Sequence, residues 1–169
     1  MPVQRLNHAV LYVRDVDRSV AFYTEALGFR VKTALPGRAA FLQAEGSTND
    51  HDLGLFAIGG EAGASTAGRG AVGLYHLAWE VDTLAELARI AGVLRANGAL
   101  VGASDHGSTK ALYAQDPDGL EFEVSWLVPA DLLSPDTVMR TAPLDLEAEI
   151  ARYGAETVGG IGVSVPVAP

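Results

Sequence analysis

The feature that most restricts the fold of this sequence is an internal repeat with an offset of 68 residues. An alternating apolar run that carries His8 spans residues 6–13, and a matching run that carries His76 spans residues 74–81. Alternation of this kind predicts a half-buried strand. Because equivalent strands at a fixed offset indicate two copies of one structural unit, we expect two similar modules.

Each run is followed by the signals of an amphipathic helix and then of three strands. Asp15 is a suitable N-cap for a helix over 15–27, and Thr83 opens a capping-box pattern for a helix over 83–97. Strand signals follow at 29–33, 38–45 and 51–58 in the first copy and at 99–102, 110–115 and 120–127 in the second. Each half therefore has the order βαβββ. This order predicts an α+β fold in which the two modules form a cupped mixed sheet with the helices outside.

These patterns divide the chain into one domain over 1–128 and a tail over 129–169. The two modules and the Gly-, Ala- and Ser-rich linker between them lie at about 4–58, 74–127 and 59–73. The tail contains one predicted helix, over 143–153, with a proline near its start. We expect the tail to pack on the domain or on a partner subunit, and the chain to form a homodimer or a higher homo-oligomer.

Composition excludes several classes of function. The 169 residues include no cysteine, which rules out a disulfide framework, a cysteine zinc finger, an iron–sulfur cluster and a thiol nucleophile. Lys and Arg number 12 against 21 Asp and Glu, a net charge of −9, so neither nucleic acid nor an anionic membrane is an expected partner. No segment has the roughly 18 unbroken apolar residues of a membrane span. Residues 1–8 lack the apolar core of a signal peptide, so we expect a cytoplasmic protein.

The segment 110–124 predicts a β-hairpin with a defined register. Pro117, Asp118 and Gly119 fit a type I turn followed by a left-handed glycine, and this turn places Tyr113 directly opposite Glu123. One face of the hairpin is then polar, with Tyr113, Gln115, Glu121, Glu123 and Ser125, and the other is apolar, with Leu112, Ala114, Leu120, Phe122, Val124 and Trp126. A polar sheet face that holds two carboxylates indicates a concave site rather than a core.

The four histidines stand at the edges or starts of predicted strands. His8 and His76 hold equivalent places in the two repeats, so packing about a pseudo-two-fold axis would bring them toward one centre. Two imidazoles and a carboxylate of the polar face would form the two-histidine, one-carboxylate metal site of non-haem Fe(II) oxygenases. His51 and His106 also precede strands, but each by itself is the kind of histidine that is usually a solvated loop residue.

Together these features resemble the vicinal oxygen chelate superfamily, which includes glyoxalase I, bleomycin-resistance proteins and type I extradiol ring-cleaving dioxygenases. The resemblance rests on the paired βαβββ modules, on the opening segment over residues 6–23, and on the hairpin segment from Leu112 to Gly119 followed by Glu123. It covers about residues 4–128. Within the superfamily, the chain is most similar to the catechol 2,3-dioxygenase branch.

The resemblance implies a metal site and a reaction. Three residues match the metal ligands of the family: His8, His76 and Glu123. His51 matches the acid–base histidine of the branch, Tyr113 matches a tyrosine that donates a hydrogen bond to a substrate oxygen, and His106 lies near a second substrate-facing histidine. The implied cofactor is a divalent metal, Fe(II) first, with Mn, Ni or Zn sharing the same ligand types. The implied substrates are a catechol-type aromatic compound and O₂.

Three alternatives stay open at this point. A glyoxalase-like isomerase or lyase would use the same scaffold, usually with a fourth protein ligand and a carboxylate base. A metabolite- or antibiotic-binding protein would not need the three metal ligands. A structural dimerisation domain would not need a polar sheet face. The extradiol dioxygenase is the preferred interpretation.

Overall fold

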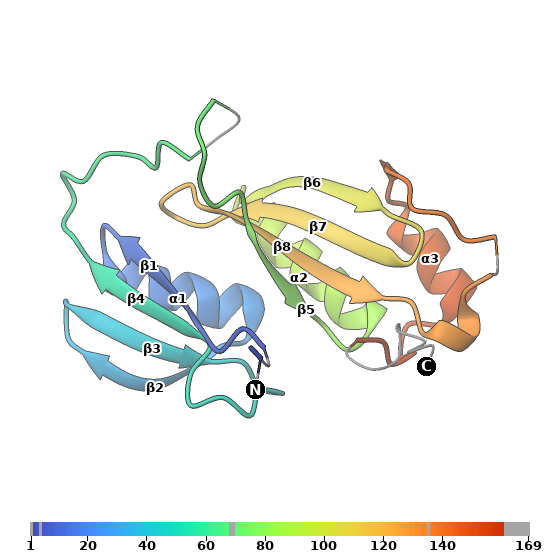
Figure 1. Ribbon diagram of the computed structural model, residues 1–169, viewed down its shortest axis with the longest axis horizontal. Helices are drawn as coiled ribbons and strands as arrows, with labels where there is room; N and C mark the ends of the chain where they lie inside the picture. Colours follow the sequence, from blue (N-terminus) through green and yellow to red (C-terminus); the bar gives the residue numbers. More distant parts are fainter. Residues whose placement is uncertain (1, 4, 68–69, 135, 161–169) are drawn as a thin grey trace. The chain divides into compact units, whose positions relative to one another are not determined.

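The computed structural model describes residues 2–3, 5–67, 70–134 and 136–160 (Figure 1). The chain forms two compact units. The N-terminal unit comprises residues 1–66 together with the turn 116–119, and the C-terminal unit comprises residues 67–115 and 120–169. Within the described residues, no helix has both the length and the apolar character needed to cross a membrane.

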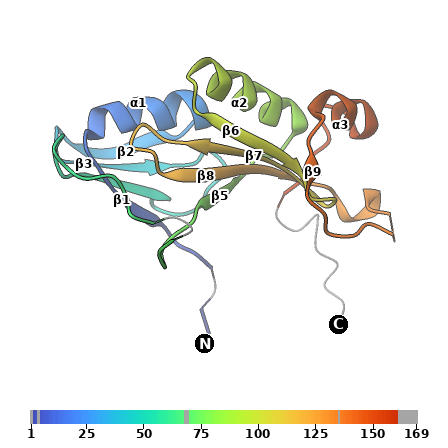
Figure 2. The same ribbon diagram turned by 90° about the horizontal axis from the view of Figure 1, so that it is seen from above.

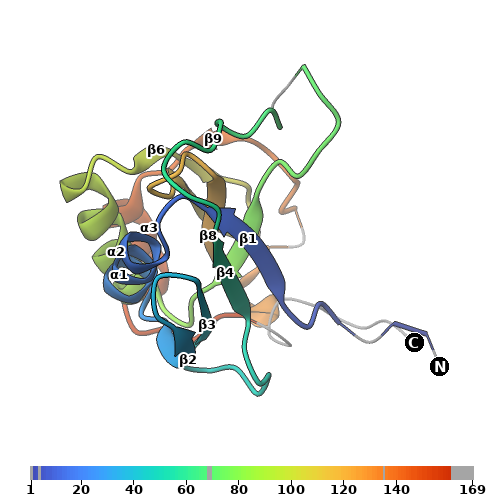
Figure 3. The same cartoon turned by 90° about the vertical axis from the view of Figure 1, so that its left-hand side faces the viewer.

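The N-terminal unit contains the first predicted βαβββ module. Its elements are β1 (Ala9–Val13), α1 (Val16–Leu27), β2 (Arg30–Leu35), β3 (Ala39–Gln43) and β4 (Leu53–Ala57). The strand order is β1-β4-β3-β2, with β1 parallel to β4 and the other neighbours antiparallel. α1 lies along one side of this sheet (Figure 3). The predicted cap is confirmed, since the side chain of Asp15 accepts a hydrogen bond from the backbone N–H of Arg18.

Alternation along the strands separates a packed face of this sheet from an open face. The side chains of Leu11, Val13, Leu53 and Leu55 are buried. The alternate positions form what we call the open face, defined by Val10, Tyr12, Phe41 and Phe56. Val10, Tyr12 and Phe56 are exposed there, and the rings of Phe41 and Phe56 lie edge to face with their centroids 5.8 Å apart. The open face is therefore both apolar and aromatic.

The C-terminal unit contains the second module and part of the tail. Its elements are β5 (Leu77–Glu80), α2 (Leu84–Ala96), β6 (Leu100–Asp105), β7 (Thr109–Gln115), β8 (Glu121–Leu127), the 3₁₀ turn η1 (Ala130–Leu132), β9 (Ala142–Pro143) and α3 (Leu146–Tyr153). The strand order is β5-β8-β7-β6-β9. α2 and α3 lie on the same side of this sheet (Figure 2). The tail helix is shorter than predicted, because Pro143 pairs with Ser104 in β9 instead of opening the helix.

The α+β fold class and the hairpin register are confirmed, and the sheet arrangement is more divided than expected. Hydrogen bonds join the strands into two mixed sheets, one for each module, instead of a single sheet. Tyr113 lies directly opposite Glu123 in the antiparallel β7–β8 pair. The predicted apolar face is buried, with Leu112, Phe122, Val124 and Trp126 each no more than 2% exposed.

The end of the described chain packs over Trp126. The indole Nε1–H donates to the carbonyl of Thr157 at 3.1 Å, and the Tyr153 ring lies 5.5 Å from the Trp126 ring. Gly159 passes so close that a β-carbon there would lie 2.6 Å from the indole Nε1, and closer still to the carbonyl oxygen of Leu127. Only a residue without a side chain fits at this position.

Two glycine-to-alanine changes should therefore act in opposite directions. Gly159→Ala should destabilise the protein by about 1–3 kcal/mol, since the added carbon overpacks a filled site. Gly92→Ala should stabilise it by about 0.5–1 kcal/mol, because Gly92 lies within α2 with nothing within 4 Å of an added β-carbon. Thermal unfolding of both variants measures this difference. A Gly159→Ala protein that melts like the wild type would contradict the close packing at Trp126.

Candidate functional site

The N-terminal unit brings two of the predicted site histidines together. His8 precedes β1 and His51 lies two residues before β4, and these strands are parallel neighbours in which Ala9 is paired with Leu53. Parallel pairing places the starts of both strands at one edge of the sheet. The two imidazole rings lie 4.6 Å apart, and the Phe41 ring of the open face lies 5.1 Å from that of His51.

Hydrogen bonds set the tautomer of both rings. His8 Nδ1 lies 2.7 Å from Asn7 Oδ1, and His51 Nδ1 lies 3.0 Å from Asp50 Oδ2. Both partners are acceptors, so Nδ1 carries the proton in each ring and Nε2 has a lone pair. A lone pair at Nε2 suits a metal ligand, as predicted for His8, and equally a general base, as predicted for His51.

The loop before β4 is held by Asp52, a residue that the sequence analysis did not single out. Its carboxylate accepts hydrogen bonds from Ser47 Oγ at 2.7 Å, Asn49 Nδ2 at 2.7 Å and the Ala44 backbone N–H at 2.8 Å. Asn49 Nδ2 also donates to the carbonyl of Asn7 at 2.7 Å. The loop is therefore tied to the residue that precedes His8. The polar run from Ser47 to Asp52 was the available signal, since such side chains commonly bond to nearby backbone groups in turns.

Asp52→Asn should loosen this loop. The change places an amide NH₂ where the structure needs an acceptor for part-buried donors, and leaving such donors unsatisfied costs on the order of 1 kcal/mol. Asp50→Asn is the matched control, because the Asp50 side chain is 92% exposed and surface changes usually stay within about 0.5 kcal/mol. Urea unfolding of both variants measures the difference. Equal stability of the two variants would mean that Asp52 does not hold the loop.

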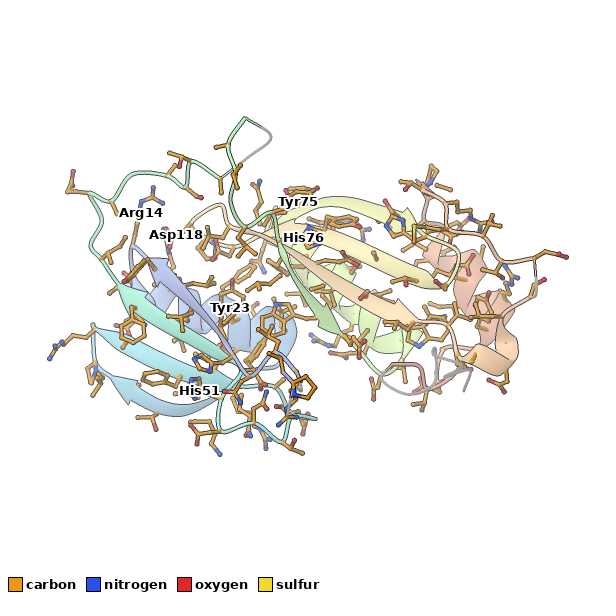
Figure 4. All side chains as sticks on the ribbon, in the orientation of Figure 1. Arg14, Tyr23, His51, Tyr75, His76 and Asp118 are labelled. Atoms are coloured by element: carbon orange, nitrogen blue, oxygen red, sulfur yellow. The ribbon has the colours of Figure 1, made fainter. Side chains whose placement is uncertain are left out.

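The C-terminal unit brings a histidine and a carboxylate of the predicted metal site into contact. His76 stands just before β5, beside Tyr75 (Figure 4), and β5 runs parallel to β8 with Ala78 paired to Glu123. His76 Nε2 lies 3.2 Å from Glu123 Oε2. His76 Nδ1 is buried and has no hydrogen-bond partner.

The geometry of this pair fits a shared divalent metal. Two donor atoms each about 2.1 Å from one ion, at roughly a right angle to each other, lie about 3.0 Å apart, close to the observed separation. Imidazole nitrogen and carboxylate oxygen are the donor types that Fe(II), Mn and Zn accept. Among the described residues, however, no three His, Cys, Asp or Glu side chains form a group that could hold a metal ion. The geometry of His76 and Glu123 thus fits two ligands of one ion, and the ligand set as a whole stays a prediction.

Tyr113 and His106 complete the group in the C-terminal unit. His106 Nε2 lies 2.9 Å from the Tyr113 hydroxyl, and the Tyr113 ring lies 5.8 Å from the His76 ring. Burial raises the pKa of Tyr113 above its usual value. The negative charge of Glu123, and the hydrogen bond between the phenol and that carboxylate, raise the pKa of Tyr113 further. The phenol is therefore protonated at neutral pH.

The two aspartates of the β7–β8 turn have a structural role. Asp118 accepts from the Arg14 guanidinium at 2.9 Å and from Arg18 at 2.6 Å (Figure 4), and Tyr23 donates to Asp116 at 3.2 Å. Burial by itself would raise the pKa of Asp118, but the hydrogen bonds from Arg14 and Arg18 lower it below its usual value. These carboxylates are engaged with α1 and its N-terminal flank and are not available as metal ligands.

The predicted site residues thus form two groups. His8 and His51 lie together in the N-terminal unit, whereas His76, Glu123, Tyr113 and His106 lie together in the C-terminal unit. All four histidines lie beside strand ends, as expected. The metal site of His8, His76 and Glu123 stays a prediction.

Comparison with known proteins places the chain in a family. Residues 5–124 match the Glyoxalase/Bleomycin resistance protein/Dioxygenase superfamily. The chain belongs to this superfamily. The match covers both βαβββ modules and ends just after Glu123, so it includes every predicted site residue.

Individual relatives of this superfamily member differ in activity. A catechol-2,3-dioxygenase of Bacillus subtilis is 30% identical over 155 residues, which are 89% of this chain and 53% of the relative, so the chain spans about half the length of that protein. A glyoxylase/bleomycin resistance protein/dioxygenase domain from Frankia is 23% identical, with a TM-score of 0.62 over 73% of this chain and 92% of that one. A lactoylglutathione lyase from Agrobacterium tumefaciens is 25% identical, with a TM-score of 0.54 over 74% of this chain and 95% of that one.

Proposed function

We propose that this protein is a metal-dependent extradiol dioxygenase that cleaves a catechol-type aromatic ring with O₂. The observation that carries the proposal is the contact between His76 Nε2 and Glu123 Oε2, with the protonated hydroxyl of Tyr113 beside it. The relationship to a catechol-2,3-dioxygenase supports the choice of reaction.

In this proposal, His8 joins His76 and Glu123 as the third ligand of Fe(II), with Mn, Ni or Zn as alternatives. The bound metal would lower the pKa of the catechol and couple it to O₂. The chain itself supplies the positions of the ligands. The Nδ1–H of His8 is engaged by Asn7, which leaves Nε2 for the metal.

His51 and Tyr113 have the groups needed to handle protons and substrate oxygens. His51 presents a lone pair at Nε2 and can take a proton from a substrate hydroxyl and later return it. Tyr113 supplies a hydroxyl for a hydrogen bond with a substrate oxygen. The aromatic open face beside His51 suits a planar ring, since offset and edge-to-face contacts between aromatic rings are favourable. The product would be a ring-opened semialdehyde.

A metal-dependent lyase or isomerase is the second candidate, because one structural relative is a lactoylglutathione lyase. That chemistry would be expected to use a further carboxylate as ligand or base. The open-face positions of β4 are Gly54 and Phe56, and neither carries a carboxylate. This absence favours the dioxygenase. A metabolite- or antibiotic-binding protein is the third candidate, and a protein that takes up no metal and shows no turnover would support it.

Activity assays distinguish these candidates. Protein purified anaerobically and loaded with Fe(II) is mixed with a panel of catechols, and oxygen uptake is recorded in parallel with the yellow absorbance of the semialdehyde. We expect equal consumption of oxygen and catechol. The same protein is tested for conversion of S-lactoylglutathione and its hemithioacetal precursor. No oxygen uptake with any catechol, together with isomerisation of the hemithioacetal to the thioester, would replace the proposal with the lyase.

A further inference from the structure

The C-terminal segment, residues 136–160 beyond the superfamily match, reaches the predicted site at His106. His106 Nδ1 lies 2.8 Å from the backbone carbonyl of Arg140, 34 residues further along the chain. The other ring nitrogen, Nε2, lies 2.9 Å from the Tyr113 hydroxyl. The His106 ring therefore connects a backbone atom of this segment with a side chain of the polar sheet face.

This arrangement determines the hydrogen-bond directions. A carbonyl oxygen only accepts, so His106 Nδ1 carries a proton. In the neutral imidazole, Nε2 is then an acceptor, and the Tyr113 hydroxyl is the donor of the bond between them. The Tyr113 hydroxyl also makes a hydrogen bond with the Glu123 carboxylate, so the single phenolic proton has two acceptors, and the Nδ1–H tautomer of His106 draws it toward Nε2.

Ion pairs to the buried carboxylate of Asp105 fix the position of the Arg140 backbone. The Arg140 guanidinium Nε donates to Asp105 Oδ2 at 3.0 Å, and Asp105 Oδ1 accepts from Lys110 Nζ at 2.5 Å. Lys110 is fully buried and also contacts Glu149 of α3 at 3.0 Å. Asp105 itself is buried. Burial by itself would raise the pKa of Asp105, but hydrogen bonds from Lys110 and Arg140 lower it to about 2, so the carboxylate is charged at any pH of interest.

β9 adds a second attachment of the same segment. It pairs with β6 so that Ala142 lies opposite Asp105 and Pro143 opposite Ser104 (Figure 2). Arg140 is two residues before this pairing. The backbone pairing of β9 and the bond from the Arg140 side chain to Asp105 thus hold the segment beside His106.

We propose that Arg140, held by Asp105, is a positioning residue: its carbonyl fixes the tautomer of His106 and, through His106, the direction of the Tyr113 O–H bond. The effect on turnover rests on the proposed dioxygenase function. The tautomer itself does not, because it depends only on the hydrogen bonds of the folded chain. The C-terminal segment is therefore part of the functional site and not merely a tail.

The tautomer can be observed directly. In protein labelled with ¹⁵N-histidine, long-range ¹H–¹⁵N correlation spectra distinguish an Nδ1–H from an Nε2–H imidazole, and His106→Gln identifies the signal. We expect a single Nδ1–H tautomer for His106 in the wild type. Arg140→Ala should give a mixture of tautomers, and Arg140→Lys should restore part of the Nδ1–H form. Arg152→Ala is the matched control. Arg152 belongs to the same segment, but it contacts the Tyr153 ring, whereas Arg140 bonds to Asp105.

Kinetics test the consequence for Tyr113. In the catechol assay, Arg140→Ala should lower kcat by about 10-fold, within the range for partners that orient functional groups at metal sites, with little change in KM. In a Tyr113→Phe background the same change should have no further effect on kcat, since the two act through one bond. A wild-type Nε2–H tautomer, or equal and additive losses in both backgrounds, would overturn the proposal. If the catechol assay fails while the tautomer shifts as expected, the positioning of His106 stands and the proposed reaction falls.

Discussion

Glu123→Ala and His76→Ala are each expected to empty the predicted metal site and to abolish ring cleavage while the protein stays folded. Both side chains are part-buried and lie 3.2 Å from each other, so either change removes one donor of the pair. Losing even an indirect partner of a metal ligand costs about 10–100-fold in metal affinity, and loss of a direct ligand should exceed that. Metal content after dialysis and circular dichroism of the same samples measure the two effects separately.

His8→Ala tests the third ligand, which only the sequence predicts. It should lower metal content as strongly as the other two changes. Glu121→Gln is the matched control, since Glu121 lies on the same face of β8, two residues away and opposite Gln115. It should keep the metal and most of the activity. Full metal content in His8→Ala would remove His8 from the ligand set and leave His76 and Glu123 with a different partner.

His51→Gln is expected to keep metal and substrate binding but to lower turnover by about 10²–10⁴, the usual contribution of a positioned acid–base group. Glutamine keeps hydrogen-bonding capacity but cannot exchange a proton near neutral pH. Tyr113→Phe should do less damage, because it removes one hydrogen bond and no proton relay. Single-turnover measurements with Fe(II)-loaded protein separate the chemical step from binding.

The His51→Gln variant also distinguishes the dioxygenase from the lyase or isomerase. A lyase or isomerase with its own carboxylate base would not require His51, so the His51→Gln variant would then keep its activity. Turnover of catechol by His51→Gln within about twofold of the wild type would contradict the acid–base role. Asp50→Asn is a useful comparison, because Asp50 accepts a hydrogen bond from His51 Nδ1 but is exposed. It should lower turnover far less than loss of the imidazole does.

The β7–β8 hairpin could be predicted from its local sequence alone. The turn at Pro117, Asp118 and Gly119 fixes the register of the two flanking strands. That register places Tyr113 opposite Glu123, as observed. The positive φ of 81° at Gly119 is the backbone conformation that this turn requires. Strand alternation then assigned the polar and apolar faces, because side chains in a strand point to opposite sides in turn.

The helix caps and the repeat were also accessible from the sequence. Asp15 and Thr83 bond to the backbone N–H groups of Arg18 and Glu86 as their patterns predicted. The repeat predicted equivalent places for His8 and His76, and both stand immediately before the first strand of their module. These are short-range properties, which depend on a few neighbouring residues.

Contacts between distant segments could not be predicted in this way. Lys110 lies on the otherwise apolar face of the hairpin, and only its pairing with Asp105 and with Glu149 of α3 explains a buried ammonium there. Nothing in the tail signals that the carbonyl of Arg140 meets His106.

The sequence by itself thus determined the two βαβββ modules, the register of the hairpin and the residue types of the site, because alternation, caps and turns act over a few residues. The tertiary structure decided which of those residues meet, namely His8 with His51 and His76 with Glu123. It also decided that the C-terminal segment holds His106. Such meetings depend on strand order and on packing between segments far apart in the chain, which no local pattern encodes.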